Sequence, residues 1–175
     1  MKKILLFSAC VMLAFSSCKK SDKNSSTASN TITVTVGSSN LSFNTAATAV
    51  LANSSGSYVL LVSGATGTGS NAQAISIAID SENPIVKGTY TLNSSTSPDA
   101  TSFPQISYVQ SASTTNPVSF TSDITGTNAS TITITSISST NVQGTFNGVL
   151  VSDQDGTTTK SVTDGKFNVA VTSHP

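Results

Sequence analysis

The sequence has few charged residues, no tryptophan, no arginine, one histidine and two cysteines among its 175 residues. Both cysteines, Cys10 and Cys18, lie in the first eighteen positions, so no disulfide can form within the rest of the chain. Five of the eight lysines precede residue 24, and the remainder carries three lysines against seven acidic residues, a net charge of −4. An acidic segment without arginine is not expected to bind nucleic acid.

The shortage of histidine and cysteine also limits the chemistry. His174 lies next to the C-terminus, so no Ser-His-Asp set can form from internal residues, and the usual zinc and transition-metal ligand sets lack their donors. No spacing of carboxylates singles out a glycosidase pair. The segment Asp153-Gln154-Asp155-Gly156-Thr157 begins like a calcium loop but lacks a distal glutamate, which favours an acidic hairpin turn. We therefore expect a protein that is not an enzyme and that holds no metal or cofactor.

The N-terminal segment has the pattern of an export signal. Met1-Lys2-Lys3 is positively charged, and residues 4–15 form an apolar run that is too short to span a bilayer as a helix. Small residues then precede Cys18, and the order of these parts resembles a lipoprotein signal peptide with its lipobox at 14–18. The resemblance implies a diacylglyceryl group on the Cys18 thiol, cleavage before Cys18, and acylation of the new amino terminus with a fatty acid such as palmitate.

The chain divides into three predicted parts. We expect a lipoprotein signal peptide at 1–17, a lipidated flexible tether at 18–30 and a single β-domain at 31–175. The tether is polar and rich in small residues, without hydrophobic periodicity, and its reach is roughly 20 Å. The domain would therefore stay close to its membrane.

Hydrophobic periodicity predicts the fold class. Residues 31–36, 74–80, 131–135 and 166–171 alternate between apolar and polar, which is typical of strands with one buried face. Segment 58–62 is apolar on both faces, which indicates a central strand. Further candidate strands are 47–52, 88–92, 105–110, 117–121 and 142–151. The sequence thus predicts an all-β domain, an antiparallel sandwich or barrel of about 8–10 strands.

Two C-terminal motifs are distinctive. Residues 144–148 read Gly-Thr-Phe-Asn-Gly, and residues 163–169 read Thr-Asp-Gly-Lys-Phe-Asn-Val. This pair resembles a group of small Bacteroidetes-type lipoproteins of uncharacterised function, in which a GTF.G strand is followed by a T.GKF.V strand. The resemblance implies a β-sheet fold and a place in the cell envelope, as an outer-membrane lipoprotein on the periplasmic face or the cell surface. It implies no catalytic residue.

Aromatic side chains are the remaining candidates for a binding site. Phe103 and Tyr108 fall in a region rich in proline and serine, 97–117, where we expect exposed loops that could contact a ligand. The leading hypothesis is a non-enzymatic envelope lipoprotein that binds a glycan or an envelope protein. Two alternatives stay open: a passive surface-coat protein, and a calycin-like barrel that holds an apolar small molecule.

Overall fold

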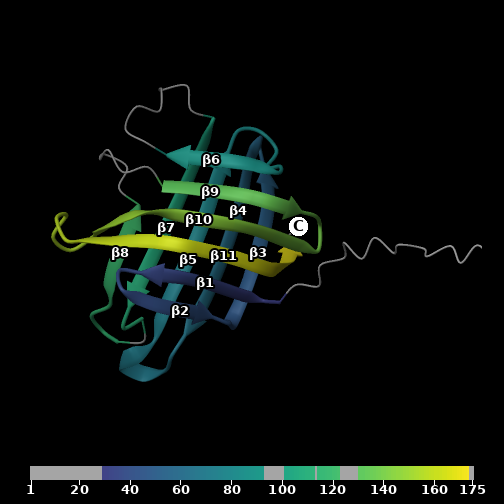
Figure 1. Ribbon diagram of the computed structural model, residues 1–175. Coiled ribbons are helices and arrows are strands. Elements are labelled where there is room, and N and C mark those ends of the chain that lie inside the picture. The colour runs from purple at the N-terminus through teal and green to yellow at the C-terminus, as the bar shows by residue number, and fades with distance from the viewer. Residues whose placement is uncertain (1–28, 93–100, 113, 123–129, 174–175) are drawn as a thin grey trace, which may run out of the picture.

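The computed structural model describes residues 29–92, 101–112, 114–122 and 130–173 (Figure 1). These residues form eleven strands: β1 Thr31–Val36, β2 Ser39–Phe43, β3 Thr45–Ser54, β4 Ser57–Thr66, β5 Gln73–Ser81, β6 Gly88–Leu92, β7 Ser102–Gln110, β8 Val118–Ser122, β9 Ser130–Ile137, β10 Asn141–Ser152 and β11 Thr159–Ser173. The helical element η1, Gly69–Asn71, has three residues. Within these ranges no helix has the length and apolar character needed to cross a membrane.

The strands form two layers that cross each other (Figure 1). The front layer has the order β6-β9-β10-β11-β1-β2, and the back layer has the order β3-β4-β5-β7-β8. Two long strands join the layers at opposite corners. The end of β11 pairs with β3 through Val171, Thr172 and Ser173, and the end of β10 pairs with β8 through Leu150, Val151 and Ser152. Strands that pass from one sheet to the other in this way are typical of orthogonal β packing.

The all-β class is confirmed, and each of the ten candidate strands is present. The structure adds one strand, β2, whose short length and preceding Gly37 make it look like part of a turn in the sequence. One pairing departs from the expected antiparallel pattern, because β3 and β11 pair in parallel. That pairing arises because β11 extends beyond β1 and reaches the neighbouring layer, a long-range event with no local sequence signal.

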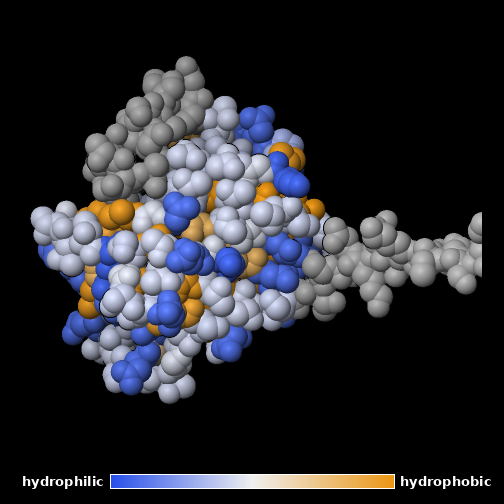
Figure 2. Space-filling view, viewed as in Figure 1, coloured by the Kyte–Doolittle hydropathy of each residue, from blue (hydrophilic) through white to orange (hydrophobic). Residues whose placement is uncertain are grey.

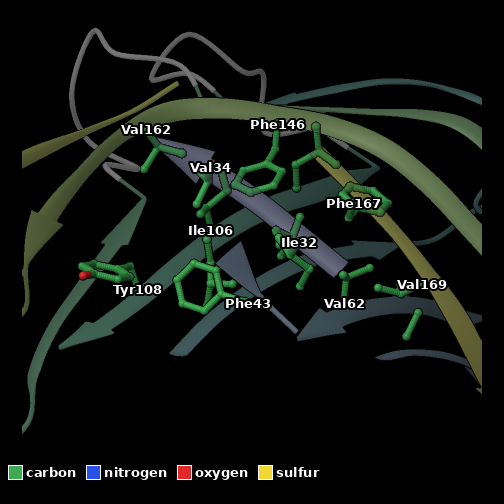
Figure 3. Packing of buried hydrophobic residues seen from close by; sticks show 14 of the residues in the cluster. Ile32, Val34, Phe43, Val62, Ile106, Tyr108, Phe146, Val162, Phe167 and Val169 are labelled. Atoms are coloured by element: carbon green, nitrogen blue, oxygen red, sulfur yellow. The ribbon is translucent and has the colours of Figure 1, made fainter. Parts of the chain in front are cut away.

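The core lies between the two layers. Alternating apolar residues of both layers point toward one another, as Figure 3 shows for Ile32, Phe43, Ile106 and Phe146. Full burial of each such side chain contributes about 1.5–3 kcal/mol to the free energy of unfolding. Every buried apolar residue among those described, except Ala72, belongs to these strands and to one cluster. The described strands of both layers therefore share one core.

The two C-terminal motifs pair with each other across β10 and β11. Gly144 lies opposite Phe167, and Phe146 lies opposite Gly165. The two rings stack with their centroids 6.3 Å apart. A Cβ atom on Gly165 would lie 2.7 Å from Cδ2 of Phe146, and one on Gly144 would lie 2.9 Å from Cε1 of Phe167. Each phenylalanine therefore occupies the space left by the glycine opposite, so the motifs serve packing of the core.

Candidate functional site

The structure separates the two predicted ligand-binding aromatics. Phe103 and Tyr108 belong to β7 instead of a loop, and their odd spacing places them on opposite faces of the strand. Phe103 is 54% exposed on the outer face of the back layer. Tyr108 is 2% exposed, so the expectation that it lies at the surface is wrong.

Tyr108 is a core residue with a satisfied hydroxyl. Its ring packs edge-to-face against Phe43 with centroids 6.5 Å apart, and its hydroxyl donates a hydrogen bond of 2.8 Å to Oε1 of Gln73. Burial raises the pKa of the Tyr108 hydroxyl, because the ionised form loses hydration there. An aromatic patch shared by Phe103 and Tyr108 therefore does not form.

Cys18 and His174 lie outside the described residues, as does the predicted signal peptide 1–17. Of the predicted tether, the structure describes only Ser29 and Asn30. Oδ1 of Asn30 accepts a hydrogen bond of 2.9 Å from the main-chain N–H of Ala170, and the Ser29 hydroxyl donates one of 3.2 Å to the carbonyl oxygen of Asn168. These two residues are thus bound to β11.

The acidic segment 153–157 forms the hairpin turn between β10 and β11. Oδ1 of Asp155 accepts hydrogen bonds of 2.8 Å from the main-chain N–H groups of Thr157 and Thr158, and Oδ2 accepts one of 2.6 Å from the Thr158 hydroxyl. These bonds, that from the Thr158 hydroxyl above all, hold the pKa of the Asp155 carboxyl well below its usual range. The carboxylate oxygens therefore serve the turn. In the part of the chain that the structure describes, no three His, Cys, Asp or Glu residues gather where they could hold a metal ion.

A β-bulge in β11 shapes the outer face of the front layer. Thr33 pairs with Lys166 and Thr35 pairs with Thr163, so the register shifts by one residue between them. Asp164 takes up the extra residue with a φ of 54°, a left-handed conformation that Asp tolerates better than most residues. Bulges of this kind redirect side chains and often lie beside binding sites.

Beside this bulge lies a hollow of about 350 Å³ over β1 and β2, which we call the front hollow. Five of its seven lining residues have side chains that can form hydrogen bonds, and the other two are apolar: Thr33, Val34, Thr35, Asn40, Leu41, Ser42 and Asp164. The Thr35 hydroxyl donates a hydrogen bond of 2.7 Å to Oδ1 of Asn40, which fixes the orientation of the amide. The surrounding face is mainly hydrophilic or intermediate in hydropathy (Figure 2).

The lining of the front hollow includes side chains that can donate and accept hydrogen bonds. A carboxylate accepts hydrogen bonds from sugar hydroxyls, an amide both donates and accepts, and threonine adds a hydroxyl and a methyl group. Sequence reasoning missed this site, although one signal was present. Val162 and Phe167 are five residues apart, yet both point into the core. In a regular strand, residues on one face are an even number of positions apart, so this odd spacing indicates a bulge between them.

No protein-family profile, curated protein or solved structure matches this chain. The assignment of a function therefore depends on the chain's own residues and geometry.

Proposed function

We propose that this protein is an envelope lipoprotein, held in the outer membrane by lipid on Cys18, whose β-domain binds a glycan without catalysing a reaction. The anchor is supported by the order of the N-terminal segments, with a basic start, an apolar run and small residues before Cys18. Two or more acyl chains give stable anchoring, whereas one gives only marginal binding.

The anchor is tested by labelling cells with a fatty acid analogue of palmitate. The wild-type chain and the control variant Cys10→Ser should both take up label and fractionate with the outer membrane. The variant Cys18→Ser should take up none. Equal labelling of both cysteine variants would contradict the proposal, because it would place the lipid elsewhere.

The glycan-binding role is supported by the front hollow of about 350 Å³, whose lining includes one carboxylate, one amide and three hydroxyl side chains. Such a site suits a ligand that offers many hydroxyl groups and little charge. Large side chains fill the interior between the layers, which favours a site on the outside over an apolar ligand within.

The test is a thermal-shift screen of residues 21–175, which include every strand and core residue described, against a panel of envelope and host glycans. A ligand at 100 times its dissociation constant should stabilise the domain by about 2.7 kcal/mol, a shift of several degrees. Asp164→Asn should weaken binding by about 10-fold or more, because a charged acceptor is lost, while its left-handed backbone is kept.

Asp153→Asn is the matched control, since Asp153 is an exposed aspartate of the β10–β11 turn that does not line the front hollow. It should bind the same glycan as tightly as wild type. A screen in which no glycan shifts the wild-type melting temperature would overturn the glycan proposal. So would equal binding by Asp164→Asn and Asp153→Asn.

A further inference from the structure

The outer face of the back layer, which we call the back face, carries almost no charge. Its outward residues come from β3, β4, β5, β7 and β8, and among these strand residues only Asp80 is charged. At the β8 edge the Asp153 carboxylate adds a second charge, because its Oδ2 accepts a hydrogen bond of 3.2 Å from the Thr121 hydroxyl. Leu61 and Phe103 are 38% and 54% exposed there. Strand β4 is apolar on both sides, yet its outward residues face solvent. Strands of that composition are normally covered on both faces, so the back face has the character of an interface.

Hydroxyl residues form one row across the whole back face. The register places one residue of each strand directly beside the next, in the order Thr48, Ser63, Ser76, Ser107 and Thr121. Neighbouring strands are about 4.8 Å apart, so the row is about 19 Å long. It divides the back face into two unlike halves.

One half is hollow and the other half protrudes. On one side of the hydroxyl row, the short side chains of Ala65 and Ala74 leave a hollow of about 310 Å³, which we call the back hollow. On the other side, Leu61 projects beside Val50 and Ala78. Leu61 and Ala65 lie on the same strand, two residues to either side of Ser63.

We propose that two copies of this chain pack back face to back face, around a twofold axis that runs along the hydroxyl row. Rotation about this axis keeps each strand above its counterpart and exchanges the two halves of the face. Leu61 of each copy then enters the back hollow of the other, between Ala65 and Ala74. The contact is isologous and closes as a dimer. The two layers stack at about 10 Å, the usual distance between packed sheets.

Area favours a second copy as the partner, and the charge of Asp80 does not oppose it. Asp80 lies four residues from Ser76 along β5, or about 13 Å, so the two copies of Asp80 would be about 26 Å apart, beyond a Debye length of about 8 Å. Five strands of about nine residues cover about 24 Å by 30 Å, or about 1,400 Å² for both copies together. That area falls within the range of about 1,200–2,000 Å² of specific interfaces.

The dimer is independent of the proposed glycan site, because the front hollow lies on the other layer. The first test is sedimentation equilibrium of residues 21–175, with Leu61→Glu as the disrupting variant. Val86→Glu is the control, since Val86 is 57% exposed between β5 and β6, away from the hydroxyl row. Wild type and Val86→Glu should have twice the monomer mass. Leu61→Glu should raise the dimer dissociation constant by about 100-fold, because it would bury an unpaired charge.

A second measurement guards against a folding defect in Leu61→Glu. The segment 21–175 contains no cysteine, so Ser76→Cys adds a single thiol on the proposed axis. A bis-maleimide with a span of about 10 Å should link two copies of this variant, and should not link two copies of Asn40→Cys on the front layer. A wild-type chain that stays monomeric up to about 1 mM would overturn the dimer. Equal crosslinking of the two cysteine variants would overturn this geometry.

Discussion

Replacement of Gly165 by alanine should destabilise the domain because the opposite phenylalanine already occupies the space. The new Cβ would lie 2.7 Å from both Cδ2 and Cε2 of Phe146, and also against the main-chain oxygen of that residue. The main-chain atom cannot rotate away, so β10 and β11 must separate. Overpacking of this kind costs about 1–3 kcal/mol. Because this domain has about 145 residues, the melting temperature should fall by roughly 3–10 °C.

Gly88→Ala supplies the matched control. Gly88 opens β6, its φ is not positive, and a Cβ there would meet nothing within 4 Å. Alanine should be neutral or slightly stabilising at that position, because it reduces the conformational entropy of the unfolded chain. Urea denaturation of both variants would measure the difference in the free energy of unfolding.

A double-mutant cycle isolates the contact with the ring. Phe146→Ala alone should lower the free energy of unfolding by about 3–5 kcal/mol. In the Phe146→Ala variant, the added Gly165→Ala substitution should lower the free energy of unfolding less than it does in wild type. The difference should be about 0.5 kcal/mol or more, because only the clash with the main-chain oxygen remains. If Gly165→Ala unfolds at the same urea concentration as Gly88→Ala, the packing of Phe146 against Gly165 does not contribute to stability as argued.

Three further predictions concern stability. Tyr108→Phe should lower the free energy of unfolding by about 0.5–1.5 kcal/mol, measured by urea denaturation, because the hydrogen bond to Gln73 is lost. In wild type, stability should fall above about pH 10, because the Tyr108 hydroxyl ionises at a lower pH in the unfolded chain than in the folded one. That fall should be smaller in Tyr108→Phe. The pKa of Asp155 is lowered on folding, so its carboxylate contributes to the free energy of unfolding above about pH 4 and contributes less as the pH falls. In an acid titration monitored by circular dichroism, stability should therefore decline less steeply with falling pH for Asp155→Asn than for wild type. Phe43→Ala should lower the free energy of unfolding by about 3–5 kcal/mol, whereas Phe103→Ala should change it by at most about 0.5 kcal/mol; similar losses for both would contradict the observed burial.

The strands themselves could be read from the sequence, because alternation is a local property. Ile32, Val34 and Val36 recur with a period of two, and that period alone places them on one face of β1. Strand β2 was missed because two apolar residues in five, after a glycine, look like a turn. Residues 105–110 were predicted as a strand, but Tyr108 was expected at the surface because its neighbourhood is rich in serine and proline. Pairing with β5 and β8 makes the segment a central strand, and Tyr108 lies on its buried face.

The surfaces that carry the two proposals were decided by long-range pairing. Which strand lies beside which depends on hydrogen bonds between residues far apart in the chain, as between Val171 and Ala49 or Leu150 and Ser122. The front hollow needs the bulge at Asp164 beside β1, and the hydroxyl row needs five strands in one register. The sequence by itself therefore determined which face of each strand is buried. Only the tertiary structure decided which outward residues become neighbours, because period-two alternation is set within a strand and register is set between strands.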